Sequence, residues 1–323
     1  MMEYDLVVVG AGIAGMTAAL EAGKRGTKNI LIIEREDYIG GILNQCIHNG
    51  FGLELLGEEV TGPEFINIIN EKLKDIDCTI KLKTSVLEIS KDNIISYVNE
   101  KEGINEIKAK AIILATGCRE RYTGNILIPT NKYEGVSTVG NAHRFINIEG
   151  LFPGKEPLIT ANSRWAMILA RRVQIEGGKV SAILLSEDSG YIPTEEDLEL
   201  IKPFNIKILK GYTLTELSGD GRIQSAKLKN NNGSDEIEIN CDSLFLSVGY
   251  YPELGIVKKI NLLKDKEKRV PILEGFKTSI DGIFACGNVI YGTDCVNLKN
   301  IDGIECGIEA AKYLKDNFAS FSE

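Results

Sequence analysis

The stretch Val7–Leu20, "VVVGAGIAGMTAAL", decides the fold of this 323-residue chain. A short β-branched run ends at a glycine-rich turn with the pattern G-x-G-x-x-G, and an apolar helical pattern continues to Lys24. A second apolar run, Ile30–Ile33, ends at the acidic residue Glu34. This order of strand, glycines, helix, strand and acid is typical of a Rossmann unit that binds a dinucleotide.

Each glycine of this turn has its own physical role. Gly10 allows the tight turn, Gly12 lets a pyrophosphate approach bare backbone, and Gly15 lets the helix pack closely on the strand. The start of the helix presents unpaired N–H groups and the positive end of its dipole to the phosphates. Glu34 lies about 20 residues further on, where a carboxylate binds ribose hydroxyls. We therefore predict that this turn binds a dinucleotide.

A second unit of the same design begins at "EPLIT" (156–160), the expected strand. The expected helix spans Arg164–Ile175, the pair Gly177-Gly178 ends it, and "KVSAILL" (179–185) is the next expected strand. The hairpin and strand that follow, up to Gly249, complete the unit. The chain therefore contains two dinucleotide-type units.

The second unit lacks the glycines of the first. Its three glycine positions hold Ala161, Ser163 and Ala166. The third position tolerates alanine, whereas a left-handed Ala161 would cost about 1–2 kcal/mol. The Ser163 side chain lies where a pyrophosphate would contact bare backbone. We expect this unit to fold but to bind NAD(P)H weakly or not at all.

Composition restricts the classes of partner. Hydrophobic residues make up 43% and charged residues 26%, the balance of a globular protein, and the net charge of -9 argues against binding nucleic acid or an anionic membrane. No apolar stretch is long enough to span a membrane, and the first residues lack the basic segment of a secretory signal. Seven scattered cysteines without Cys-x-x-Cys are typical of a reducing compartment, so we expect a cytoplasmic protein.

Three further segments carry a family resemblance. Gly40-Gly41-Ile42-Leu43-Asn44-Gln45 follows Glu34, "AIILATGCRE" spans 111–120, and "GIFACGNVI" spans 282–290. They resemble the Gly-Gly segment, the Ala-Thr-Gly strand end and the Gly-Asp motif of the pyridine nucleotide–disulfide oxidoreductase family, which are FAD flavoproteins with two dinucleotide domains. Asn288 stands where that motif has aspartate. The length and the order of the parts resemble the short thioredoxin-reductase-like branch, without its redox disulfide.

This resemblance implies an α/β fold with two Rossmann-like dinucleotide-binding domains, the second nested in the first. We expect an FAD-binding domain at 1–118 and 245–323 and a degenerate NAD(P)-binding-like domain at 119–244. The last helix is expected to begin near Val296 and to aim its N-terminus at the flavin pyrimidine. The residues that the resemblance assigns to FAD are Gly10, Gly12, Ala14, Gly15, Glu34, Arg35, Gly41, Ile42, Gln45, Val86, Ala115, Thr116, Gly117, Gly287, Asn288 and Val296.

Cys46 and His48, in "NQCIHNGFG" (44–52), are the candidate catalytic residues. Cys46 follows the Gly-Gly segment, where the family's chain passes the flavin ring, and it is either a single redox cysteine or a buried inert thiol. In the first case His48 would stabilise the thiolate or move protons. Two ligands are too few for a metal site, and the cysteines are too scattered for an iron–sulfur cluster, so we predict no metal.

The main functional hypothesis is an FAD-dependent oxidoreductase that exchanges electrons between its flavin and a protein partner. That partner is a ferredoxin-like carrier or a sister dehydrogenase subunit, because "QCIHNGF", "ATGCRER" and "FACGNV" also resemble FAD subunits of multi-subunit amino acid, opine or hydroxy acid dehydrogenases. One alternative is an NAD(P)H-dependent oxidase or peroxidase that uses Cys46. Another is a non-catalytic flavin-binding subunit that supports assembly. We expect a homodimer or a hetero-oligomer.

Overall fold

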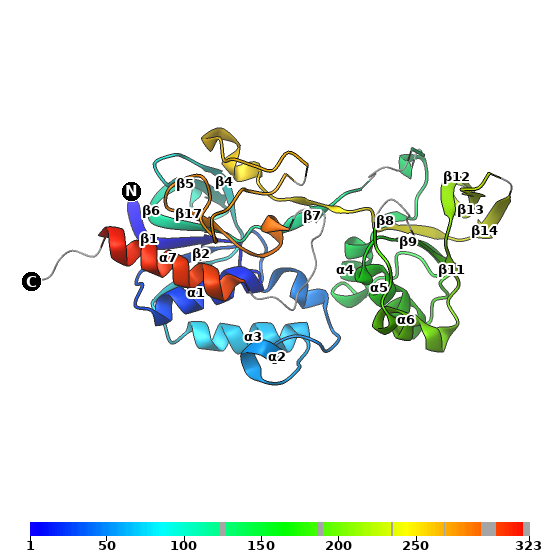
Figure 1. Cartoon of the computed structure of the whole chain (residues 1–323), viewed down its shortest axis with the longest axis horizontal. Coiled ribbons are helices and arrows are strands. Elements are labelled where there is room, and N and C mark those ends of the chain that lie inside the picture. Colours follow the sequence, from blue (N-terminus) through cyan, green and yellow to red (C-terminus); the bar gives the residue numbers. More distant parts are fainter. Residues whose placement is uncertain are drawn as a thin grey trace, which may run out of the picture. The chain divides into compact units, whose positions relative to one another are not determined.

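The structure is a computed structural model that describes residues 1–122, 127–128, 130–185, 190–233, 235–267, 269–291 and 302–318. The chain divides into two compact units (Figure 1). Unit 1 combines Met1–Arg119 with Tyr251–Glu323, and unit 2 is the intervening segment Glu120–Tyr250. The second unit is therefore inserted into the first, as expected of nested dinucleotide domains.

Unit 1 is built on a mixed sheet with the order β3-β2-β1-β6-β5-β4, and β17 also pairs with β6. Strands β1, β2, β3, β6 and β17 are parallel, whereas β4 and β5 form an antiparallel extension. The strands are β1 (Met2–Val9), β2 (Ile30–Ile33), β3 (Cys78–Lys81), β4 (Thr84–Ile89), β5 (Ile94–Asn99), β6 (Gly103–Leu114) and β17 (Ile283–Ala285).

The register brings the ends of three central strands together. Val9, the last residue of β1, pairs with Ile33 of β2 and with Leu114 of β6. The ends of β1, β2 and β6 are apolar and fully buried, which is typical of parallel strands covered on both faces. The carboxyl edge formed in this way is where open α/β sheets bind their ligands.

The helices of unit 1 pack through small residues. Helix α7 (Gly303–Phe318) lies beside α1 (Ile13–Lys24), as Figure 1 shows. A Cβ atom on Gly307 would lie 2.3 Å from the backbone oxygen of Ala18, so only hydrogen fits there. The remaining helices are α2 (Leu53–Leu56) and α3 (Gly62–Leu73), and Thr61 and Glu64 form a capping box at the start of α3.

Unit 2 contains a parallel five-stranded sheet with the order β11-β10-β9-β15-β8 and a separate antiparallel sheet β12-β13-β14. Its helices are α4 (Val139–Asn147), α5 (Arg164–Ile175) and α6 (Glu195–Ile201). Its strands are β8 (Val136–Thr138), β9 (Pro157–Ala161), β10 (Ala182–Leu185), β11 (Ile208–Leu209), β12 (Tyr212–Asp220), β13 (Arg222–Asn230), β14 (Glu236–Asn240) and β15 (Ser243–Leu246). Both units thus have the α/β architecture that the sequence predicts.

The chain passes from unit 1 into unit 2 between residues 119 and 120, and it returns between residues 250 and 251. The boundary expected after residue 244 would cut β15, which pairs with β8 and β9 of unit 2, so that boundary lies six residues further on. The crossing segments β7 (Cys118–Glu120) and β16 (Tyr250–Pro252) pair with each other.

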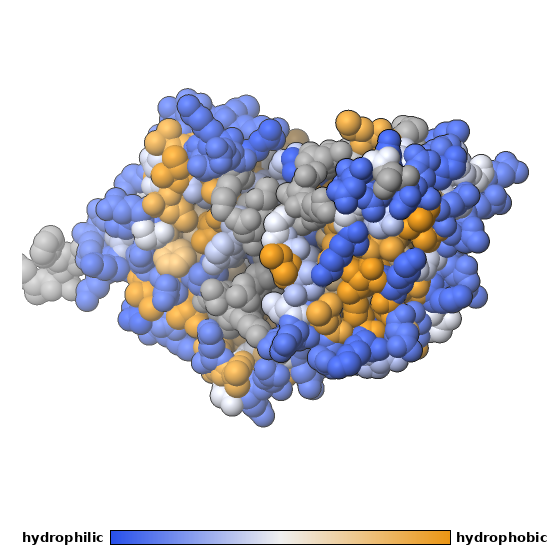
Figure 2. Space-filling model, turned by 45° about the vertical axis from the view of Figure 1, so that its right-hand side comes forward, coloured by the Kyte–Doolittle hydropathy of each residue, from blue (hydrophilic) through white to orange (hydrophobic). Residues whose placement is uncertain are grey.

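The surface is mixed in character. Figure 2 shows hydrophobic areas that are interrupted by hydrophilic side chains. Among the large apolar side chains with high exposure are Ile104, Leu127 and Ile192. Of the helices that the structure describes, none combines the length and the apolar character that a membrane span requires.

The glycine packing of α7 can be tested by mutation. Gly307→Val should destabilise unit 1 by about 1–3 kcal/mol or more, because the side chain must displace the α1 backbone. Lys315→Val, at an exposed position of the same helix, is the matched control and should cost only about 0.5 kcal/mol. Urea unfolding measures both. Equal destabilisation by the two variants would contradict this packing.

Candidate functional site

The site is built around the turn that follows β1. Gly10 has a φ of 109°, and its N–H donates to the backbone oxygen of Ile33 at 2.8 Å. A Cβ on Gly10 would lie 2.4 Å from the oxygen of Ala115, and one on Gly15 would lie 2.0 Å from the oxygen of Gly10. These two glycines are required because backbone packs directly on backbone.

Gly12 differs from its neighbours because space is open in front of it. It is the N-cap of α1, and a Cβ placed on it would meet no atom within 4 Å. The Gly40-Gly41 segment crosses nearby: Gly40 N–H donates to Ala11 at 2.7 Å, and a Cβ on Gly41 would lie 3.3 Å from the Gly12 Cα. The helix start therefore presents bare backbone to solvent, as an approaching pyrophosphate requires.

Glu34 ties the end of β2 to this turn. Its carboxylate accepts from the N–H of Ala11 at 2.8 Å and from that of Glu36 at 3.0 Å, and the residue is buried. The neighbouring Arg35 is exposed and lies 3.6 Å from the Glu36 carboxylate. Thr84 N–H donates to the backbone oxygen of Glu34 at 2.9 Å. Strand β4, with Val86 two residues further on, therefore starts beside the acidic residue.

The end of β6 also reaches the turn. Ala115 N–H donates to the oxygen of Val9 at 2.9 Å. The Thr116 hydroxyl donates to the backbone oxygen of Glu253 at 2.7 Å, and Glu253 N–H donates to Gly117 at 2.9 Å. The strand end that resembles the family's Ala-Thr-Gly segment is thus fixed both to β1 and to the chain returning from unit 2.

The segment that resembles the Gly-Asp motif packs on the same turn. Cys286 N–H donates to the oxygen of Leu114 at 3.1 Å, and a Cβ on Gly287 would lie 2.7 Å from that of Ala14. Asn288 follows in a short 3-10 helix, Gly287–Ile290, and is half-buried. Ile42 and Gln45 lie in another 3-10 helix, Gly41–Gln45. Val296 lies outside the described residues.

Sequence reasoning missed Asp302, which also reaches this place. Its carboxylate accepts from the N–H of Gly287 at 3.1 Å. The two residues are 15 positions apart in the chain, and no local motif connects them. A family resemblance points only to the glycine and its neighbour, so the contact becomes visible only once α7 is packed on α1.

Cys46 and His48 each contact the backbone of a neighbouring residue. The Cys46 thiol is buried and donates to the backbone oxygen of Ile42 at 3.3 Å, and burial raises its pKa to about 12. The Nδ1 atom of His48 lies 2.9 Å from the oxygen of Asn49, and its ring lies 5.2 Å from that of Phe51. This geometry favours an inert thiol, because a redox cysteine reacts as the thiolate.

The second turn is filled by side chains. Ala161 does not have a positive φ, and it ends β9 paired with Leu185, so the strain expected at Ala161 is absent. Ser163 is the N-cap of α5, and its hydroxyl lies 3.4 Å from that of Ser247. The Ser247 hydroxyl in turn lies 2.5 Å from the side-chain amide of Asn162. Polar side chains therefore occupy the place of the bare backbone at Gly12.

The first turn of α5 is also committed to packing and ion pairing. Trp165 is buried edge-on against His143, with ring centroids 6.0 Å apart. Arg164 lies 3.1 Å from the Glu196 carboxylate and 3.4 Å from that of Asp197, both on α6. The Arg164 charge at this helix start is therefore already paired with protein carboxylates.

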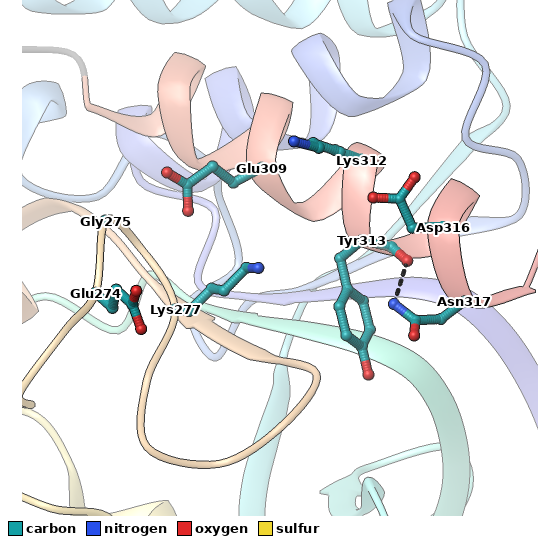
Figure 3. Close-up of a pocket in the computed structure, with 8 residues that line it drawn as sticks. All are labelled: Glu274, Gly275, Lys277, Glu309, Lys312, Tyr313, Asp316 and Asn317. Carbon is teal, nitrogen blue, oxygen red and sulfur yellow. Dashed lines mark hydrogen bonds between the residues drawn. The ribbon is translucent and has the colours of Figure 1, made fainter.

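A groove of about 370 Å³ lies elsewhere in unit 1, between the 274–277 turn and the later turns of α7 (Figure 3). Its lining mixes both signs of charge, with Lys277 and Lys312 beside Glu274, Glu309 and Asp316. It contains none of the residues of the glycine turn, so it is not the dinucleotide site. Within the described part of the chain, no three His, Cys, Asp or Glu residues are grouped to hold a metal ion.

The residues around Gly12 fit an FAD molecule. The open backbone at the start of α1 suits a pyrophosphate, Glu34 stands at the end of β2 for a ribose, and the Asn288 amide is placed on the segment beside Ala14. At Ser163, by contrast, the hydroxyl and the Asn162 amide converge on Ser247.

The role of Gly12 can be separated from those of the other glycines. Gly12→Val should leave the melting temperature of the apoprotein within about 2 °C, because the side chain enters open space. It should weaken FAD binding by at least about tenfold, because that space is where the pyrophosphate fits. Gly15→Val is the control and should lower the melting temperature strongly. A Gly12→Val protein that binds FAD normally would contradict the assignment.

Alkylation tests the state of Cys46. With a pKa of about 12, the thiolate fraction at pH 8 is on the order of one in ten thousand. Iodoacetamide should therefore leave Cys46 unmodified in the native protein at pH 8, while the half-buried Cys118 provides an internal comparison. Peptide mapping by mass spectrometry measures both. Alkylation of Cys46 at the rate of a free thiol would support the redox role instead.

Comparison with known proteins agrees with this geometry. The model of the pyridine nucleotide-disulphide oxidoreductase family matches residues 4–155 and 194–312. A ferredoxin–NADP reductase of Halalkalibacterium halodurans is 26% identical over 88% of this chain and 85% of that protein. A thioredoxin reductase of Peptoclostridium litorale is 24% identical over 98% of each chain.

Solved structures share the fold. Thioredoxin reductase of T. acidophilum superposes with a TM-score of 0.75 at 21% identity, covering 99% of this chain and 100% of that one. The bacillithiol disulfide reductase Bdr of Bacillus cereus gives 0.76 at 18% identity, covering 98% and 99%. Because the family model matches most of both units, the chain belongs to the pyridine nucleotide-disulphide oxidoreductase family and is an FAD-dependent oxidoreductase of the thioredoxin-reductase-like kind.

Proposed function

We propose that this protein is an FAD-dependent electron-transfer enzyme whose flavin exchanges electrons with a protein partner and not with NAD(P)H bound at unit 2. The observation that carries the proposal is the contrast between Gly12 and Ser163. Both residues are the N-cap of the first helix of a Rossmann unit. The first leaves open space in front of the helix, whereas the second places a hydroxymethyl group there that contacts Ser247.

The family comparison supports the contrast. The stretch that the family model leaves unmatched, 156–193, contains β9, the second turn, α5 and β10. These are the parts that would contact a dinucleotide in unit 2. The matched residues 4–155 include the whole glycine turn of unit 1. The family match is therefore continuous over the turn that would bind FAD and interrupted at the second turn, where a nicotinamide cofactor would bind.

The residues of unit 1 would hold and orient the flavin nucleotide. The start of α1 and the bare backbone at Gly12 would bind the pyrophosphate, Glu34 would bind the adenosine ribose, and the Asn288 amide would bond a ribityl hydroxyl. When bound, the isoalloxazine ring supplies hydride or single-electron chemistry. The protein determines where that ring lies and how much water reaches it.

The kind of redox partner can be inferred from a motif that the sequence lacks. Its sequence has no Cys-x-x-Cys pair, so electrons cannot pass through a redox disulfide of the thioredoxin-reductase type. Relatives are named ferredoxin–NADP reductase, which describes those proteins and makes a small protein carrier a reasonable partner here. A ferredoxin-like carrier or a sister flavoprotein subunit is therefore the proposed partner, in a homodimer or a hetero-oligomer.

A peroxidase that uses Cys46 is the second candidate function. The position of Cys46 favours this function, because Cys46 directly follows the 3-10 helix Gly41–Gln45 beside the glycine turn. Burial and the raised pKa of its thiol oppose it. Cys46→Ser separates the two: it would abolish peroxide reduction under the peroxidase hypothesis and would leave electron transfer unchanged under ours. A non-catalytic flavin subunit would show no turnover with any donor.

Anaerobic titration tests the proposal. Stoichiometric NADH or NADPH should leave the flavin oxidised, while dithionite bleaches it, because the second turn cannot seat a pyrophosphate. The variant Ala161→Gly/Ser163→Gly should tighten NADH binding by about tenfold, since it restores bare backbone. Ala170→Gly loosens the same helix away from the turn and is the control. Rapid bleaching of the wild-type flavin by NADH would contradict the proposal.

A further inference from the structure

Asp302 joins both ends of the 3-10 helix that carries Asn288. Its Oδ2 atom accepts from the N–H of Gly287 at 3.1 Å and from the hydroxyl of Tyr291 at 2.8 Å. Gly287 begins this helix, and Tyr291 is its C-cap. One carboxylate oxygen therefore holds the segment at its first residue and just after its last one.

This carboxylate lies next to the glycine turn. Gly303, the residue after Asp302, packs so closely that a Cβ on it would lie 2.1 Å from the backbone oxygen of Ala14. On the other side of the contact, a Cβ on Gly287 would lie 2.7 Å from the Cβ of Ala14. The start of α7 and the Asn288 segment thus meet on Ala14, which lies between Gly12 and Gly15.

The Asn288 side chain lies on the segment that Asp302 holds. Among the residues that the structure describes, its side-chain amide has no hydrogen-bond partner, although it is half-buried. An aspartate at that position would add a second carboxylate to the segment whose first residue, Gly287, already binds Asp302. Two neighbouring carboxylates repel each other and raise the cost of ionising both. The departure from the family pattern at Asn288 therefore has a physical reason in Asp302.

Burial of the Asp302 carboxylate disfavours its ionised form. Burial is the main influence on Asp302 and raises its pKa above the usual value, against the opposing effect of hydrogen bonds from Tyr291 and Gly287. The Glu305 carboxylate acts in the same direction as burial. A half-buried carboxylate that makes two hydrogen bonds to one segment is typical of a residue that fixes that segment in place.

We propose that Asp302 is the positioning residue of the flavin site. Its carboxylate takes the place of the aspartate that the family motif has where this chain has Asn288. It holds the 287–291 segment against Ala14, which leaves the Asn288 amide available for a hydroxyl of the cofactor. It also keeps one negative charge beside the flavin nucleotide. The inference rests on FAD binding to unit 1, so the FAD affinity of the wild-type protein is measured first.

A double-mutant cycle tests the exchange of carboxylates. Asp302→Ala should weaken FAD binding by about tenfold or more, because both hydrogen bonds to the segment are lost. Asn288→Asp alone should also weaken binding, because it places two carboxylates together. The double variant Asn288→Asp/Asp302→Ala should bind FAD more tightly than Asp302→Ala. Titration of apoprotein by quenching of FAD fluorescence gives the dissociation constants.

The flavin midpoint potential provides a second readout. Reduction adds electrons and negative charge to the flavin, so a nearby carboxylate disfavours it. Asp302→Ala and Asp302→Asn should both raise the midpoint potential, and the double variant should return it toward the wild-type value. A residue that only stabilised the fold would not produce this pattern. Spectroelectrochemical titration measures the potential.

The chain offers a matched control on the same helix. Tyr313 of α7 donates to the Asp281 carboxylate at 2.7 Å, which is another Asp–Tyr pair, at the other end of β17. Asp281→Ala should lower the melting temperature without changing FAD affinity or midpoint potential. Tyr291→Phe, which removes one of the two bonds to Asp302, should give an FAD affinity between those of wild type and Asp302→Ala.

These experiments distinguish a failure of this inference from a failure of the proposed function. Unchanged FAD affinity in Asp302→Ala, or additive losses in the double variant, would overturn the inference. If Asp302→Ala fails to fold, Asp302→Asn and Tyr291→Phe carry the same test, and normal FAD affinity and potential in both would overturn it. A wild-type protein that refuses FAD would instead overturn the proposed function, before any variant is compared.

Discussion

The structure depends on close contact between backbone segments at the end of β1. A Cβ atom on Gly10 or Gly15 would lie within 2.4 Å of a backbone oxygen, so the turn closes only with glycine. This closure brings the ends of β1 and β6 and the start of α1 to one point at the carboxyl edge of the sheet. Segments from the far end of the chain, at Gly287 and Gly303, then pack on Ala14 of the same turn. Gly12 remains the open place in front of the helix, and the chemistry of the site follows from that opening.

The second unit has the same order of strand, helix and strand as the first, but different groups lie at its turn. Strand β9, helix α5 and strand β10 follow each other as β1, α1 and β2 do. In place of backbone contacts, hydroxyl and amide side chains of Ser163, Asn162 and Ser247 meet at the start of α5. These groups are joined by side-chain contacts, whereas the turn of unit 1 presents bare backbone at Gly12. The sheet and helix of unit 2 therefore form without the bare backbone that Gly12 provides in unit 1.

Much of the fold could be predicted because its signals are local. The bounds of α1, β2 and α5 follow from their apolar patterns, and glycines shortly after the two helices mark where these end. The prediction of backbone strain at Ala161 was wrong, because β9 extends through that residue in a normal strand conformation. The sequence left Cys46 open between a redox cysteine and a buried inert thiol, because its burial is decided by the packed structure. The contact of Asp302 with Gly287 could not be predicted, because it joins residues 15 positions apart that no local motif connects.

The central claim is that one unit of this protein leaves backbone open to a dinucleotide and the other does not. Equilibrium dialysis of one apoprotein sample against FAD and NADH together, with the stoichiometry of each read by its absorbance, tests this most directly. We expect one FAD per chain and no NADH retained at concentrations that saturate the FAD site. Retention of one NADH per chain beside the FAD, lost again when Ser163 is replaced by a bulkier residue, would contradict it.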